Sequence, residues 1–163
     1  MWIAAIGLAM AGKYDGLDPD VRGERVVPAP AEQVFAYLLD LNHLQAMFPP
    51  DCVGRWEIGE RSFGEGANAI VRYDMAMMHR KLPMTLVRAV APTYIDFDHV
   101  GPRGFVTRWT LEPAEGGTKV VVETPLTAPP PPLLGYYHNT VKPEWEGCYA
   151  RALENLEKGL ASK

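Results

Sequence analysis

The feature that most constrains the fold is an unbroken run of β-type segments followed by one long helical pattern. Between residues 52 and 125 the sequence indicates six strands, with no helical stretch among them. Glycine- and proline-containing connections such as Glu115-Gly116-Gly117 divide the strands and are typical of hairpins, so the segment predicts an antiparallel meander. The expected strands are residues 52–60, 68–78, 80–89, 94–100, 105–112 and 119–124.

Further elements are expected on both sides of the meander. Residues 21–27 form a first strand that Pro28-Ala29-Pro30 ends, and residues 31–39 and 41–47 form two short helices. Pro143 predicts either a kink near residues 139–143 or a helix that starts there, with the proline in its first turn. One apolar stripe at steps of three and four predicts a long terminal helix, and it contains Trp145, Cys148, Tyr149, Ala152, Leu153, Leu156 and Leu160.

The length suits one domain over residues 21–163, preceded by an apolar segment and turn over residues 1–20. The apolar run that begins at Met1 is shorter than the about 20 residues that a membrane-spanning helix requires. Ala9-Met10-Ala11 resembles a signal-peptidase site, but no Lys or Arg precedes the run. A retained segment packed on the domain or on a partner, and a cytoplasmic location, are therefore favoured. A truncated export signal or membrane association is the alternative.

Charge and residue spacing exclude several classes of site. A net charge of -4 without a basic stripe argues against a nucleic-acid partner. The four histidines show no close ligand spacing, so neither a metal site nor a cofactor is expected. Cys52 and Cys148 lie far apart and form no CxxC pair, and the expectation is two buried thiols.

Three short motifs point to a known superfamily. They are the stretch Val26-Val27-Pro28-Ala29-Pro30-Ala31-Glu32-Gln33-Val34-Phe35-Ala36-Tyr37-Leu38-Leu39-Asp40, the turn Gly116-Gly117-Thr118 and the helix ending Ala152-Leu153-Glu154-Asn155-Leu156. In these motifs and in the order of its elements, the chain resembles the SRPBCC superfamily, which includes START-type, polyketide cyclase-like and birch-pollen-allergen-like proteins. The resemblance implies an α+β helix-grip fold. In that fold a curved antiparallel sheet of about seven strands surrounds a long C-terminal helix, and two short helices lie between the first two strands.

The resemblance also implies a cavity between the sheet and the terminal helix, and strand alternation indicates which residues face it. Large, adaptable apolar side chains share one parity, whereas Arg72, Asp74, Arg108, Lys119 and Glu123 fall on the opposite face, which suits water. The expected cavity residues are Val71, Tyr73, Met75, Met77, Met84, Leu86, Phe97, Phe105, Trp109, Val122, Tyr137, Trp145 and Tyr149.

Three functions are compatible with these residues. The favoured one is the binding of a small hydrophobic molecule, lipid-like, aromatic or polyketide-like, in the cavity. The alternative is a cofactor-independent cyclase or dehydratase in which Tyr73 and His99, which share the inward parity, act as acid and base. The second alternative is a membrane- or protein-facing lipid delivery module that uses the apolar N-terminus. The sequence does not fix the oligomeric state.

Overall fold

The fold comes from a computed structural model that describes residues 20–75, 78–100, 105–125 and 131–163. Strands and helices follow the predicted order, and their bounds differ from the predicted ones by a few residues. The elements are β1 (Val21–Val27), α2 (Ala31–Leu38), α3 (Leu41–Met47), β2 (Val53–Ile58), β3 (Asn68–Met75), β4 (Met78–Val90), β5 (Tyr94–His99), β6 (Phe105–Ala114), β7 (Gly117–Thr124), α4 (Pro131–Tyr136), the π-helical turn η1 (Tyr137–Val141) and α5 (Lys142–Ala161).

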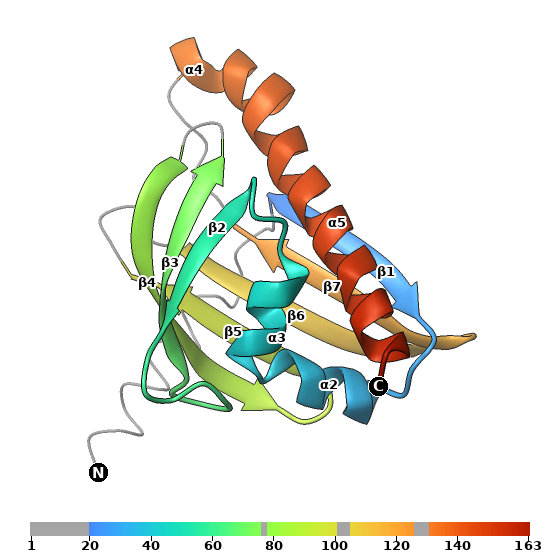
Figure 1. Cartoon of the computed structure of the whole chain (residues 1–163). Coiled ribbons are helices and arrows are strands. Elements are labelled where there is room, and N and C mark those ends of the chain that lie inside the picture. Colours follow the sequence, from blue (N-terminus) through green and yellow to red (C-terminus); the bar gives the residue numbers. More distant parts are fainter. Residues whose placement is uncertain (1–19, 76–77, 101–104, 126–130) are drawn as a thin grey trace.

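The strands form one antiparallel sheet in the order β1-β7-β6-β5-β4-β3-β2. From β2 to β7 each strand pairs with the next one in sequence, and β1 pairs with β7. The sheet curls so that its concave face lies against α5, while α2 and α3 lie at one end of it (Figure 1). The predicted helix-grip architecture, with a seven-stranded sheet around a long terminal helix, is confirmed.

The terminal helix packs on the sheet through the stripe that the sequence predicted. Trp145, Cys148, Tyr149, Ala152, Leu153, Leu156 and Leu160 are the buried residues of α5. The helix packs tightly against Gly23 of β1, where an added Cβ would lie 2.8 Å from the Cβ of Tyr149. A larger residue at position 23 would therefore push α5 away from β1 and widen the space between the two layers.

The position of Pro143 agrees with the second predicted form, a helix start with the proline in its first turn, and the π-helical turn before it was not predicted. The chain runs from α4 through η1 into α5, and Pro143 stands in the first turn of α5 directly after the π-helical turn. Proline has no N–H to donate, and its ring crowds the carbonyl group one turn earlier. A π-helical turn inserts one extra residue and thereby gives room to that ring without ending the helix.

Arg108 was predicted to face water, but its side chain is largely shielded from it. The side chain of Arg108 is only 18% exposed and pairs with Asp96, whose side chain is 3% exposed. Two parallel hydrogen bonds join them, from Nε to Oδ1 at 2.7 Å and from Nη2 to Oδ2 at 2.8 Å. The prediction for Arg108 is wrong because a buried carboxylate on the neighbouring strand requires a cation beside it.

The two cysteines also differ from the prediction, because Cys52 and Cys148 form a disulfide with Cα atoms 6.1 Å apart. The expectation of two free buried thiols is therefore wrong. The residues are 96 positions apart, and only the folded sheet brings the start of β2 against the middle of α5.

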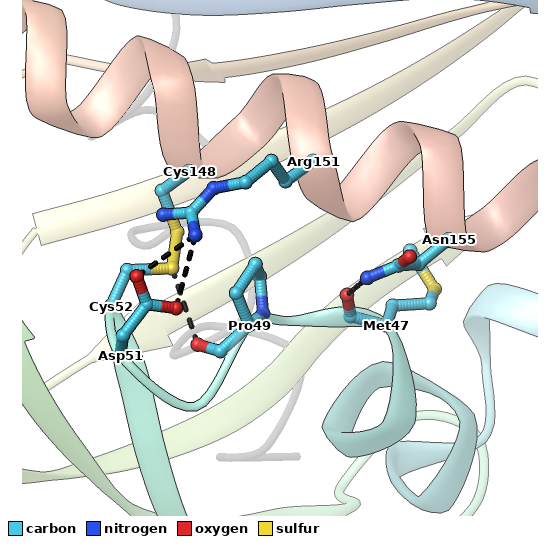
Figure 2. Close-up of a disulfide and its surroundings, with 7 residues drawn as sticks. All are labelled: Met47, Pro49, Asp51, Cys52, Cys148, Arg151 and Asn155. Carbon is cyan, nitrogen blue, oxygen red and sulfur yellow. Dashed lines mark hydrogen bonds and ion pairs between the residues drawn. A yellow bond between two sulfur atoms is a disulfide. The ribbon is translucent and has the colours of Figure 1, made fainter.

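Two further contacts lie on the same face of α5 as the disulfide (Figure 2). Arg151 Nη1 lies 2.8 Å from Asp51 Oδ2, and Asn155 Nδ2 donates to the carbonyl oxygen of Met47 at 2.7 Å. We call the three contacts from Cys148, Arg151 and Asn155 to residues 47–52 the α5 joint. The joint fastens the helix to the connection between α3 and β2.

Candidate functional site

A small cavity lies between the concave face of the sheet, α5 and the connection between α3 and β2. Its wall has three parts: inward side chains of β3 to β6, two aromatic residues of α5, and residues from α3 to β2. The lining residues are Leu44, Phe48, Val53, Trp56, Tyr73, Met84, Phe97, His99, Thr107, Trp109, Trp145 and Tyr149.

The cavity encloses about 30 Å³, which is room for about two water molecules. Pockets that hold a drug-sized ligand measure about 300 to 1,000 Å³. The structure is therefore a closed form, and a ligand larger than a few atoms requires the wall to move outward.

Aromatic rings make up most of the wall and contact one another across the layers. The ring centroid of Trp145 on α5 lies 6.1 Å from that of Tyr73 on β3. Phe48 lies 6.2 Å from Trp109 and 6.4 Å from Tyr149. These pairs take the stacked and edge-to-face arrangements that aromatic rings prefer, so the wall consists of closely packed apolar ring surfaces.

A chain of hydrogen-bonded side chains crosses the cavity floor, and it begins with the two residues predicted as acid and base. Tyr73 OH lies 2.8 Å from Nδ1 of His99, on strands β3 and β5. Both residues are 4% exposed. The other ring nitrogen of His99, Nε2, lies 3.4 Å from the hydroxyl oxygen of Thr107 on β6.

The chain continues to the terminal helix. The hydroxyl oxygens of Thr107 and Thr124 lie 3.0 Å apart, and Thr124 makes a short hydrogen bond with the hydroxyl group of Tyr149 on α5. Four hydrogen bonds thus connect β3 to α5 through buried side chains. Such a network fixes the orientation of each member because every polar group in it is buried, and losing one partner would leave another group unpaired.

Burial keeps every titratable group of this hydrogen-bonded chain in its neutral form at neutral pH. It lowers the pKa of His99 from 6.5 to about 3, because the imidazolium would lose its hydration. Burial raises the pKa of Tyr149 to about 12, and it raises the pKa of Tyr73 well above 10. The site therefore presents a neutral imidazole and two neutral phenols.

The structure brings together some of the predicted cavity residues. Those on the cavity wall are Tyr73, Met84, Phe97, Trp109, Trp145 and Tyr149, together with His99. Met77 lies outside the described residues. The remaining predicted residues are buried in the adjoining core: Val71, Met75, Leu86, Phe105, Val122 and Tyr137.

Sequence reasoning missed two groups of site residues. The first group, from α3 and the start of β2, comprises Leu44, Phe48, Val53 and Trp56, which no strand of the central meander marked as inward. The second group is Thr107 and Thr124. The alternation that places Phe105, Trp109, Val120 and Val122 inward also places both threonines inward, so that signal was present in the sequence.

The described residues contain neither a metal-binding cluster nor a membrane-spanning helix. Within residues 20–75, 78–100, 105–125 and 131–163, no three His, Cys, Asp or Glu side chains lie close enough together to hold a metal ion. The helices in the same ranges also include none with the length and apolar character that a membrane span requires.

Comparison with known proteins identifies a matching family. The family model described as "Polyketide cyclase / dehydrase and lipid transport" matches residues 18–161, which is nearly the whole chain. No curated protein matches the sequence significantly.

Several solved structures share the fold. The solution structure of KanY protein (ms6282) has a TM-score of 0.71 at 19% identity and covers 90% of this chain and 99% of that chain. TTHA0849 from Thermus thermophilus has a TM-score of 0.62 at 22% identity, covering 87% and 97%. Ara h 8.0201 has a TM-score of 0.55 at 21% identity, covering 87% and 97%. At these identities the comparison supports the fold.

Proposed function

We propose, from the finding that the chain belongs to the polyketide cyclase/dehydrase and lipid-transport family, that it binds one small hydrophobic molecule between the sheet and α5. The observation that carries the proposal is the composition of the cavity wall, because its described residues are mostly aromatic and aliphatic and none of them is Lys, Arg, Asp or Glu. Burial of apolar area contributes about 25 cal/mol per Å², so such a wall binds an apolar molecule with few hydrogen bonds.

Binding requires the closed cavity to enlarge, and the wall contains residues suited to that. Met84 has a flexible, polarisable side chain that adapts to irregular shapes. Phe48 and Val53 stand on the connection between α3 and β2, which is held to α5 by the α5 joint. We therefore expect this connection to move when a ligand enters.

Native mass spectrometry of freshly purified protein, followed by denaturing extraction, tests the proposal. The expected result is a defined hydrophobic mass that stays with the folded protein and separates on denaturation. If the protein is empty, titration with apolar fluorescent probes follows, and the absence of saturable binding to any of them contradicts the proposal.

A charge placed on the cavity wall is expected to abolish this binding. Met84→Arg puts an unpaired guanidinium into a water-poor site, and we expect affinity to fall by about a hundredfold or more. Ile70→Arg is the matched control, because Ile70 lies on the same hairpin and is 42% exposed on the outer face of the sheet. Equal loss of affinity in both variants contradicts the assigned cavity. If Met84→Arg does not fold, Met84→Phe replaces it in the test, as a bulkier apolar change at the same position of the wall.

The hydrogen bond between Tyr73 and His99 favours a second candidate function, a cofactor-independent cyclase or dehydratase acting in the same cavity. Burial lowers the pKa of His99 to about 3 and so makes the imidazole a weak base, whereas the Tyr73 phenol beside it can polarise a carbonyl oxygen. If turnover is found, Tyr73→Phe is expected to lower kcat by about a hundredfold or more. Tyr94→Phe, on the outer side of the sheet beneath Arg108, is the control. Unchanged turnover in Tyr73→Phe removes that residue as the acid.

The lipid-delivery alternative rests on the apolar N-terminus, which lies outside the described residues, and it stays a prediction.

The disulfide bears on the compartment in which the chain works. Disulfides form and persist in oxidising compartments and are rare in the cytosol. The bond thus disagrees with the favoured cytoplasmic location and agrees with the export alternative. We propose an oxidising compartment. Alkylation of the protein in its source cells measures whether the two cysteines are oxidised. Rapid labelling of both cysteines before any reduction contradicts the proposal.

A further inference from the structure

We infer that the ligand is an electrically neutral apolar molecule that carries a carbonyl-type oxygen, and that this oxygen accepts a hydrogen bond from the indole N–H of Trp56. The inference rests on the proposed function and names the chemical class of its ligand. Three features of the cavity wall lead to it.

The first feature is the absence of a charged partner for the ligand. Among the described residues that line the cavity, none is Lys, Arg, Asp or Glu. His99, Tyr73 and Tyr149, which do lie on it, are all neutral near pH 7 because of their burial. A carboxylate or ammonium ligand would lose its hydration here without gaining a counter-charge, which costs several kcal/mol or more. Free fatty acids and amines are therefore poor ligands.

The second feature is a donor without an acceptor. Trp56 lines the cavity and is 7% exposed, and its Nε1 is buried with no hydrogen-bond partner among the described residues. Buried donors are almost always paired, and leaving one unpaired costs about 1 to 3 kcal/mol. The hydroxyl group of Tyr137 is also buried and unpaired, but Tyr137 does not line the cavity. Trp56 is thus the unpaired donor that a bound molecule reaches.

The third feature is the tautomer of His99 in the buried chain from Tyr73 to Tyr149. Tyr73, neutral His99, Thr107, Thr124 and Tyr149 carry one donor hydrogen each, and a hydrogen bond between Tyr149 and Thr107 adds to the four contacts along the chain. The position of the ring hydrogen on His99 therefore decides which way the hydrogen bond to Tyr73 runs. If the bonds run toward His99 from Tyr149, the His99 Nδ1–H donates to Tyr73 and the Tyr73 hydroxyl hydrogen is free.

The two spare donors lie in the same part of the cavity. Trp56 on β2 stands opposite Val71 of β3, and Tyr73 is two residues along β3 on the same face. Diagonal neighbours of this kind lie within reach of aromatic side chains. An oxygen with two lone pairs, such as the oxygen of a ketone, aldehyde or ester, accepts from both groups. A bound ligand then selects the His99 tautomer that leaves the Tyr73 hydrogen free.

A matched set of three probes tests the inference: acetylnaphthalene, ethylnaphthalene and naphthoate, each substituted at the same ring position. The first two differ by one carbonyl oxygen and the third carries a charge. In the wild-type protein we expect the ketone to bind about tenfold more tightly than the hydrocarbon, as a net hydrogen bond allows. Naphthoate is expected to show no saturable binding at neutral pH.

Trp56→Phe isolates the indole N–H, because it removes the donor and keeps an aromatic ring. The ketone-to-hydrocarbon affinity ratio is expected to fall from about ten to about three or less. Using the ratio cancels the effect of the smaller ring on both probes. Tyr94→Phe is the control, because it also removes a donor but lies outside the cavity wall, beneath Arg108. Its ratio is expected to stay at the wild-type value.

A second measurement needs no variant. The infrared carbonyl stretch of isotopically labelled acetylnaphthalene is expected at lower frequency in the protein than in hexane, because donors pull electron density from the oxygen. An unshifted stretch, equal affinities for the ketone and the hydrocarbon, or tight binding of naphthoate overturns the inference and leaves the hydrophobic pocket in place. Failure of all three probes to bind overturns the inference together with the proposed function.

Discussion

Replacing both cysteines by serine, Cys52→Ser with Cys148→Ser, is expected to lower the free energy of unfolding by about 4 to 5 kcal/mol. The bond joins residues 96 positions apart, and the entropy that a cross-link removes from the unfolded chain grows with the length of the closed loop. That loop contains β2 to β7, so almost the entire sheet is constrained by one bond. Urea unfolding measures the change through the midpoint and the slope of the transition.

The neighbouring ion pair provides the control for the disulfide. Arg151→Met removes the contact with Asp51 in the same α5 joint, but their side chains are 48% and 67% exposed. Pairs this exposed are screened by water and contribute little, so this variant is expected to unfold almost like the wild type. A loss below about 1 kcal/mol in the double serine variant would falsify the view that the disulfide, and not the polar contacts beside it, secures the joint.

The disulfide variant also connects stability to the site. Phe48 and Val53 line the cavity on either side of Cys52, and the bond holds this connection against α5. Without the bond, amide hydrogen exchange of residues 47–53 is expected to become faster than that of β6 and β7. The same release is expected to ease the enlargement that ligand entry requires.

Most of the fold was predictable because it depends on local periodicity. The apolar stripe of α5 from Trp145 to Leu160 needs only a period of 3.6 residues, and the hairpins need only glycine-rich turns. Gly117 shows why a hairpin turn needs glycine, because an added Cβ there would lie 2.0 Å from the carbonyl oxygen of Val27. The disulfide was not predictable in this way, since the proximity of Cys52 and Cys148 is a property of the folded sheet alone.

The cavity wall was only partly predictable, because alternation fixes a face and not a place on that face. Val71 and Met75 share the inward parity of Tyr73, but the curvature of the sheet buries them in the core beside the cavity. Phe48 stands on the connection that the α5 joint fastens to the helix, and Trp56 stands on β2, where its pairing opposite Val71 of β3 brings it to the wall. Which side chains pair in the hydrogen-bonded chain from Tyr73 to Tyr149 likewise depends on the register of β3, β5 and β6.

Acid is expected to destabilise the protein through His99 more steeply than through any exposed histidine. The pKa of His99 is about 3 in the folded protein and about 6.5 in the unfolded chain. Between these values the unfolded chain binds a proton that the folded protein does not, so the stability falls as the pH falls. The slope approaches about 1.4 kcal/mol per pH unit, which amounts to about 2 kcal/mol at pH 5 and on the order of 5 kcal/mol near pH 3.

His99→Asn tests this, because an amide can replace both hydrogen bonds of the imidazole but does not titrate. Other groups titrate in the same range, so the informative quantity is the difference in unfolding free energy between variant and wild type, measured from pH 7.5 to pH 4. We expect His99→Asn to be the less stable of the two at pH 7.5 and to gain on the wild type by about 2 kcal/mol or more by pH 5. A constant difference between His99→Asn and wild type across this range would mean that the imidazole of His99 is hydrated in the folded protein. The cavity floor would then be open to water, and the neutral chain from Tyr73 to Tyr149 would lose its basis.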